Sequence, residues 1–191
     1  LTTFDGTRYG EMTAVEAADQ MLAMLILRQR FYPTVFRAGW VWENNEFSKW
    51  LDDVVPFDFS NAAPLKTRTA DSVEQYVGAG YDWSQAPDNW TYYHPCDSNY
   101  QKPGNLKRIV FRCLPGHRGA DINFIKAFMR ARDGHNAIVA VYTHSFNSLG
   151  KFCRVTASSL RNAATVYPNV TTKYVNALEG AQAVLGYTDT A

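Results

Sequence analysis

The segment at residues 14–30 places the strongest constraint on how this chain can fold. Thr13 and Glu16 have the Ser/Thr-x-x-Glu spacing of a capping box, in which each side chain satisfies a backbone amide at the start of a helix. The helix that follows has to end before Pro33, and apolar residues cover most of its circumference. A helix that is apolar on nearly every side needs protein around it. We therefore expect residues 14–30 to form a helix buried in the core.

Shorter patterns follow in the first half of the chain. Residues 34–42 are expected to be extended, and residues 46–54 form an amphipathic helix that stops before Pro56. A short capped helix is expected at 71–77. Residues 79–105 are rich in aromatic residues and turn formers and show no period, which favours a long loop region buried against something rather than a disordered one.

The second half of the chain predicts a sheet followed by helices. A strand is expected at 106–114, because apolar residues alternate there. The apolar run at 136–146 predicts the central strand, with 151–157 pairing with it through the turn at 147–150. Three helices are expected: one at 122–132 with Ile122, Ile125, Phe128 and Met129 facing inward, and two at 158–167 and 171–185 that form a hairpin.

Together these elements predict one α+β domain over residues 1–191, with helices at both ends around a small central antiparallel sheet and a C-terminal helical hairpin. The length of 191 residues is enough to bury a core without disulfides or metal. No apolar run approaches the roughly 20 residues of a membrane span. Three cysteines are too few for a disulfide framework, so the cysteine content does not indicate whether the protein belongs to an oxidising or a reducing compartment.

Charge is distributed unevenly along the chain, although the formal net charge is only +1. Residues 102–132 hold eight basic residues and a single acidic one, whereas residues 1–60 hold nine acidic and five basic residues. Such a basic segment is typical of a surface that faces phosphate or nucleic acid. The alternative is a solvated basic face that pairs with the acidic first third, within one molecule or between subunits. The residues expected to contact nucleic acid are Lys107, Arg108, Arg112, Arg118, Lys126, Arg130 and Arg132.

Aromatic residues just upstream of the basic segment strengthen the nucleic-acid hypothesis. Flat side chains interleaved with basic ones are what single-stranded nucleic acid needs, since bases stack on the rings while charges hold the phosphates. The alternative is that these rings belong to the core or to a subunit interface. The aromatic residues concerned are Trp83, Trp90, Tyr92, Tyr93 and Tyr100.

A zinc site is one further possibility. His94 and Cys96 lie sixteen residues before Cys113 and His117, so that two close His/Cys pairs could supply four ligands. The His-x-Cys spacing is unusual, however, and the alternatives are two ordinary loop ends with a buried Cys113, or a disulfide between Cys96 and Cys113. We expect no cofactor, with zinc left open.

Signals for catalysis are weak. His135 and His144 are nine residues apart around the central strand, so a regular strand points them to opposite faces. Cys153 and His144, if they lay on neighbouring strands, could imitate the Cys–His pair of a thiol hydrolase. Motifs for phosphate-binding loops, nucleophile elbows and zinc proteases are absent from the sequence.

The sequence therefore favours a structural, self-assembling protein, such as a coat or nucleocapsid subunit, that binds copies of itself and contacts nucleic acid through its basic middle segment. Its location would then be a virion or another assembly. The alternative is a small nuclease-like hydrolase that uses histidines and possibly zinc. A monomeric ligand-binding domain is a third possibility.

Overall fold

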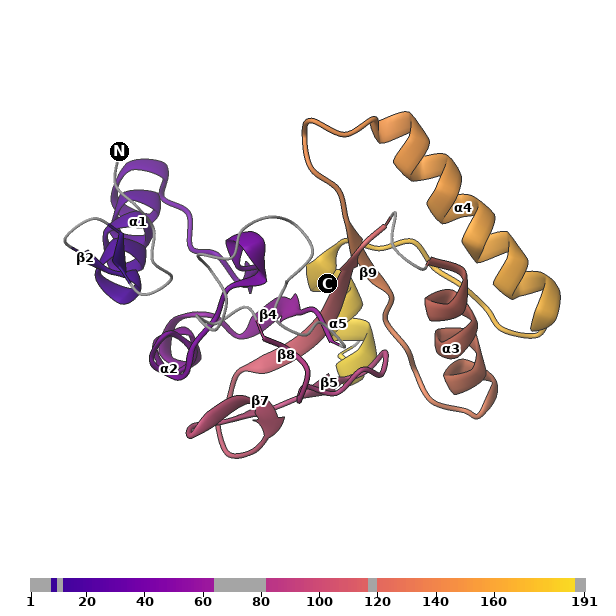
Figure 1. Cartoon of the computed structure of the whole chain (residues 1–191), viewed down its shortest axis with the longest axis horizontal. Helices are drawn as coiled ribbons and strands as arrows, with labels where there is room; N and C mark the ends of the chain where they lie inside the picture. The colour runs from indigo at the N-terminus through magenta and orange to yellow at the C-terminus, as the bar shows by residue number, and fades with distance from the viewer. Residues whose placement is uncertain (1–7, 10–11, 64–81, 117–119, 188–191) are drawn as a thin grey trace. The chain divides into compact units, whose positions relative to one another are not determined.

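The computed structural model describes residues 8–9, 12–63, 82–116 and 120–187 (Figure 1). The chain divides into two compact units, each with its own hydrophobic cluster. Unit 1 comprises Leu1–Asp88 and Tyr93–Val110, and unit 2 comprises Asn89–Tyr92 and Phe111–Ala191. The expectation of a single domain over 1–191 stays a prediction.

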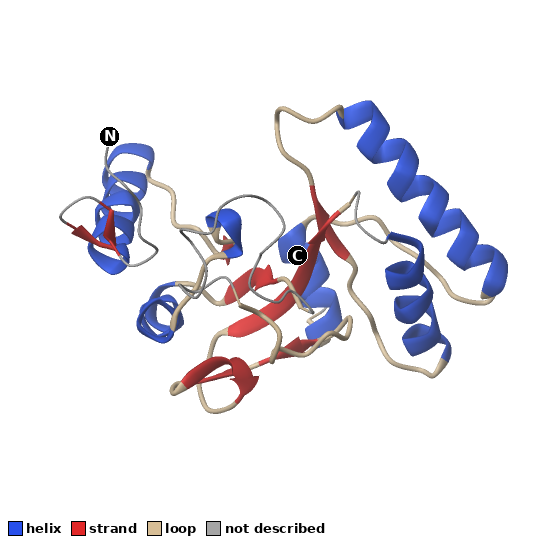
Figure 2. Ribbon diagram, viewed as in Figure 1, coloured by secondary structure: helices blue, strands red, loops and turns tan. Residues whose placement is uncertain are grey.

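Both units contain helices (Figure 2). The helices expected at 14–30, 46–54 and 122–132 are confirmed to within two residues, whereas the one expected at 71–77 lies outside the described residues. The capping box of Thr13 and Glu16 is confirmed as well. The described part of the chain contains α1 (Ala14–Gln29), the 3-10 helix η1 (Gly39–Val41), α2 (Asn45–Val54), α3 (Ala120–Arg132), α4 (Leu149–Val166) and α5 (Ala177–Leu185).

The strands are short. Two small antiparallel ribbons, β1–β2 and β6–β7, accompany a larger sheet with the strand order β3-β4-β8-β5, in which β9 also pairs with β8. The described strands are β1 (Arg8–Tyr9), β2 (Met12–Thr13), β3 (Val35–Phe36), β4 (Phe57–Asn61), β5 (Tyr92–Tyr93), β6 (Pro95–Cys96), β7 (Asn99–Pro103), β8 (Ile109–Pro115) and β9 (Ala140–Tyr142).

The larger sheet is mostly parallel, so the α+β class is correct but the expected central antiparallel sheet is wrong. β3 pairs with β4 in parallel, and β8 pairs with β9 in parallel with Cys113 opposite Ala140. The reason lies in the connection: α3 joins β8 to β9, and a strand–helix–strand crossover returns the chain in the same direction. Within the apolar run at 136–146, only Ala140–Tyr142 forms a strand.

The segment 151–157, expected to be a strand, is part of α4. Ser148 caps this helix by accepting a hydrogen bond from the backbone amide of Lys151 at 3.3 Å. Ser159 and Ala163 are buried, and Ala163 packs against Phe124 and Phe128 of α3. Phe152, Thr156, Ser159 and Ala163 have the spacing of three or four residues that places them on one side of a helix, and packing on α3 selects the helix.

The C-terminal helical hairpin is a further correction. A single helix, α4, contains nearly all of 158–167, and it lies along α3 rather than α5 (Figure 1). α5 begins only at Ala177, where Asn176 and Glu179 form a second capping box. Residues 167–176 between α4 and α5 are not helical.

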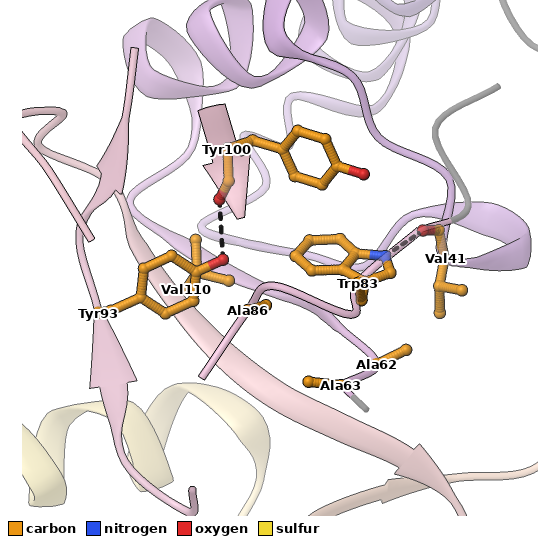
Figure 3. Close-up of a cluster of buried hydrophobic side chains, with 8 residues drawn as sticks. All are labelled: Val41, Ala62, Ala63, Trp83, Ala86, Tyr93, Tyr100 and Val110. Carbon is orange, nitrogen blue, oxygen red and sulfur yellow. Dashed lines mark hydrogen bonds between the residues drawn. The ribbon is translucent and has the colours of Figure 1, made fainter. Parts of the chain in front are cut away.

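The aromatic segment at 79–105 supplies the core of unit 1 in its described part (Figure 3). The Trp83 indole donates to the Val41 carbonyl oxygen at 2.7 Å, and the Tyr93 hydroxyl donates to the Tyr100 carbonyl oxygen at 2.9 Å. The Trp83 and Tyr100 rings meet edge to face. The buried Trp83 and Tyr93 rings therefore combine apolar packing with a satisfied polar group.

We predict that Gly104→Ala destabilises unit 1. The amide of Gly104 donates to the His94 carbonyl oxygen at 2.7 Å, and a methyl group at Gly104 would overlap Cα and Cβ of Cys96 in the adjacent β6. Because backbone has to move, we expect a loss of about 1–3 kcal/mol in the free energy of unfolding. Urea denaturation measures it, with Gly39→Ala as the control because open space surrounds that position. Equal stability of the two variants would contradict the prediction.

Candidate assembly surface

α1 is held to unit 1 through its N-terminal turns. The Glu16 carboxylate accepts from the Thr13 amide at 2.7 Å, and the Trp50 indole of α2 donates to the Asp19 carboxylate at 2.6 Å. Ala18 is the one residue of α1 that is buried. It belongs to a cluster with Trp42, Phe47, Leu51 and Val55.

The second half of α1 exposes large apolar side chains. Met21, Met24 and Leu27 are 55%, 53% and 80% exposed, and their spacing of three residues places them along one side of the helix. We call these three residues the α1 ridge. Successive helical residues turn by about 100°, so Leu27 lies opposite Ala18, the residue that faces the core. Exposed Phe31 and Tyr32 follow directly after the helix.

The expectation that the helix at 14–30 is buried in the core is therefore wrong for its second half. Among the described residues of unit 1, the buried cluster packs on the side of α1 that carries Ala18. The sequence nevertheless has the apolar composition of a helix surrounded by protein. This mismatch between composition and exposure is the main functional signal in unit 1, because contiguous exposed apolar surface on a soluble protein marks an interaction site.

Unit 2 has an exposed apolar group of its own at the start of α4. Phe146 and Leu149 are 83% and 64% exposed and flank Ser148, the residue that caps the helix. We call Phe146 and Leu149 the α4 patch. The Phe146 ring stacks on the His144 ring with a centroid distance of 4.8 Å. Both units thus present large apolar side chains to solvent.

Arg108, expected to contact nucleic acid, lies instead inside unit 1. Its guanidinium donates to Asp58, to Ser48 and, at 2.6 Å, to Glu43, and all of these side chains are buried. The backbone amide of Arg108 donates to Asp52 at 2.6 Å. A side chain bound in this way belongs to the core of unit 1 rather than to a phosphate-facing surface.

Arg112 is also buried, within unit 2. Its guanidinium stacks over the Trp90 ring at 4.4 Å and donates to the Asn123 side-chain oxygen at 3.2 Å. Most of the aromatic residues expected to stack on bases are internal too: Trp83, Trp90, Tyr93 and Tyr100 are buried, and Tyr92 is half-buried.

The other described basic residues expected to contact nucleic acid are more exposed to solvent than Arg108 and Arg112. Lys107 in unit 1 and Lys126 in unit 2 are exposed. Arg130 is half-buried and donates to a backbone carbonyl, while exposed Arg132 pairs with Asp133 at 2.8 Å. Arg118 lies outside the described residues. The sequence signal was local charge density, which does not distinguish a basic side chain that pairs internally from one that faces solvent.

The buried cluster around Arg108 has an unusual protonation state. Burial, together with the negative charge of Asp58, raises the pKa of Glu43 to about 8. Burial by itself would lower the pKa of Arg108, but Asp58 and Glu43 more than offset this and raise it. At neutral pH the Glu43 carboxyl group therefore favours its protonated form beside the Arg108 guanidinium. Sequence reasoning missed this cluster, although Asp58 between Phe57 and Phe59 on a strand is a visible signal.

We predict that Glu43→Gln flattens the pH dependence of stability. The folded chain holds a proton on Glu43 up to a pH of about 8, whereas the unfolded chain releases it near 4.5, so the free energy of unfolding falls as pH rises between these values. Glutamine mimics the protonated acid and removes this fall. Urea denaturation just above pH 4.5 and above pH 8 measures the effect. The exposed Glu46→Gln is the control, and an unchanged slope in Glu43→Gln would contradict the prediction.

The expected zinc ligands are not gathered in the part of the chain that the structure describes. His94 is exposed with Nδ1 3.1 Å from the Lys107 carbonyl oxygen, Cys96 Sγ lies 3.2 Å from the Ser98 hydroxyl, and Cys113 is buried in β8. His117 lies outside the described residues. Among those that are described, no group of three or more His, Cys, Asp or Glu side chains could hold a metal ion. The zinc site stays a prediction, and the structure links no two cysteines by a disulfide.

The structure places the candidate catalytic residues differently from the sequence-based expectation. Cys153 is exposed on α4 rather than on a strand beside His144. His135 precedes β9 and His144 follows it, and both are exposed.

Comparison of the chain with protein-family models, curated proteins and solved structures finds no match. Within the described residues, no helix combines the length and hydropathy needed to span a membrane.

Proposed function

We propose that this protein is a structural subunit that assembles with copies of itself, in the manner of a coat or nucleocapsid subunit, and contacts nucleic acid through basic residues of its middle segment. The observation that carries the proposal is the α1 ridge, an exposed apolar side of a helix that is apolar nearly all round. Burying one Leu or Met side chain is worth about 1.5–3 kcal/mol. Burial of these three side chains would offset part of the roughly 4–15 kcal/mol that association costs in lost translational and rotational freedom.

Charge supports the nucleic-acid part of the proposal. Unit 2 contains nine basic and four acidic residues, a formal charge of +5, and Lys126 and Arg132 are exposed on it. A positively charged unit attracts phosphate at long range and releases counterions on binding. Arg108 and Arg112 have internal roles, so the contribution to binding moves to Lys107, Lys126 and Arg132.

The nuclease-like alternative has less support. His135 and His144 are exposed on either side of β9, and Cys113 is buried in β8. A general acid and a general base have to reach the same substrate, and neither the histidines nor the thiol provides such a pair in the part of the chain that is described.

We predict that the wild-type protein self-associates and that Met24→Gln with Leu27→Ser weakens this. The double substitution removes exposed apolar surface without changing charge, so the monomer keeps its fold while the association loses burial. Light scattering coupled to size exclusion, over a range of concentration, measures the mass against the 21.5 kDa monomer. The exposed Gln20→Ala on the same helix is the control. A wild-type protein that stays at 21.5 kDa at every concentration would rule out the proposal.

We predict salt-dependent binding of single-stranded nucleic acid, weakened by Lys107→Ala with Lys126→Ala. Each lysine that contacts phosphate contributes about one unit to the slope of log affinity against log salt, so the double variant should lose up to about two units. Fluorescence anisotropy with a labelled oligonucleotide measures the slope. Lys49→Ala, an exposed lysine on α2, is the control. The nucleic-acid part fails if the wild type shows no binding at low salt, or if the double variant keeps the wild-type slope.

A further inference from the structure

α4 carries positive charge along the side that faces away from α3. The helix contains Lys151, Arg154 and Arg161 and no acidic residue, and all three basic side chains are exposed. Ala163 packs against α3, which lies along α4 (Figure 1). Because successive helical residues turn by about 100°, the three basic residues lie about 120–180° around the helix from Ala163. We call Lys151, Arg154 and Arg161 the α4 basic side.

The charged groups of the α4 basic side are unpaired in the described part of the chain. None of the three forms an ion pair or a side-chain hydrogen bond there. The arginines of the middle segment differ in this respect, since Arg108 and Arg112 are internal and exposed Arg132 pairs with a neighbouring aspartate. Like charges three residues apart on a helix repel each other, so an anionic partner lowers the energy of this side of α4.

Two exposed aromatic rings directly precede α4. Phe146 of the α4 patch is 83% exposed, and its ring stacks on the ring of His144 with a centroid distance of 4.8 Å and an angle of 8° between the planes. The Tyr142 ring meets the His144 ring edge to face at 5.6 Å. The Phe146 ring is therefore supported by its neighbours while most of its surface remains in water. A flat ring held in this way is suited to stack on a nucleobase.

From these observations we infer that α4 and the ring pair before it bind single-stranded nucleic acid, with phosphates on the α4 basic side and a base stacked on Phe146. The inference rests on the proposed function, since it names the surface for the nucleic-acid part. Basic side chains hold the backbone without regard to sequence, and an aromatic ring accepts any base. Lys151 and Arg161 are about 15 Å apart along the helix axis, a length that several successive phosphates of one strand span.

An anionic membrane is the other partner that a basic helix can bind, and the packing of α4 argues against it. A helix that lies on a membrane inserts an apolar face into the lipid. The apolar side of α4 is already used, because Leu160 and Ala163 pack against α3. On the basic side, the residue between Arg154 and Arg161 is the exposed, polar Ser158.

The salt dependence of binding tests the α4 basic side. Lys151→Gln, Arg154→Gln and Arg161→Gln together should reduce the slope of log affinity against log salt by about two units, since each phosphate contact with a single strand contributes about 0.7. Glutamine removes the charge and keeps a side chain that favours a helix. Fluorescence anisotropy with a labelled single-stranded oligonucleotide measures the slope, and circular dichroism checks that the variant keeps its helices.

A matched control removes the same total charge from exposed lysines outside α4 and should keep most of the wild-type slope. It consists of Lys49→Gln, Lys102→Gln and Lys173→Gln. If the α4 variant keeps the wild-type slope, or if the control loses as much, the inference is overturned while the proposed function stands. A wild type that does not bind at low salt overturns the nucleic-acid part of the proposed function instead. A wild type that binds vesicles of anionic phospholipid through α4, and not the oligonucleotide, makes the surface a membrane site and also overturns the inference.

Phe146→Ala tests the stacked base. The substitution removes no charge, so the salt slope should stay the same while the affinity falls about fivefold or more at every salt concentration. Tyr187→Ala is the control, because Tyr187 is an exposed aromatic residue outside α4, and it should bind like the wild type. Equal affinities of Phe146→Ala and the wild type would overturn the assignment of a base to this ring.

Cross-linking of the wild-type protein provides a test that involves no substitution. An oligonucleotide with a photoreactive thiouracil base should form cross-links within residues 144–161, with Phe146 as the expected contact. Cross-links confined to other segments would overturn the inference.

Discussion

A buried arginine between two acidic side chains organises unit 1. Arg108 directly precedes β8, Asp58 lies on β4 and Glu43 lies just before Asn44, the residue that caps α2, so one guanidinium connects three segments that are distant in sequence. The Ser60 hydroxyl donates to Asp58, and Arg108 also donates to Ser48. Charges removed from water in this way are tolerated only when they are paired and hydrogen-bonded, which makes the relative placement of the three segments specific.

α1 contributes little to the core of unit 1, with Ala18 as its one buried residue. The sheet has internal partners in the ion cluster and in the aromatic cluster around Trp83, and α2 contributes Ser48 to the ion cluster. α1 adds only its N-terminal turns, through Ala18 and the bond between Asp19 and Trp50. Its remaining apolar side chains are then available to another molecule. The packing of Ala18 into the core of unit 1 thus also sets which side of α1 forms the proposed assembly surface.

Local signals in the sequence were reliable where they depend on neighbouring residues. The capping box at Thr13 and Glu16, the amphipathic α2 and the limits of α3 all follow from contacts within one or two helical turns. The segment 151–157 shows where such reasoning fails. Its short mixture of apolar and polar residues was interpreted as a strand, whereas the cap at Ser148 and the contact of Ala163 with Phe124 and Phe128 on α3 favour the helix.

By itself, the sequence determined the helices near 14–30, 46–54 and 122–132, that the described aromatic residues of 79–105 are largely buried, and that charge is divided along the chain. Those properties depend on composition and on short-range spacing. Tertiary structure alone decided that the sheet is mostly parallel, that Arg108 and Arg112 are internal, and that Leu27 faces solvent. Each of these depends on residues brought together from distant parts of the chain. The identity of an arginine or a leucine does not reveal whether its partner lies within the fold or in another molecule.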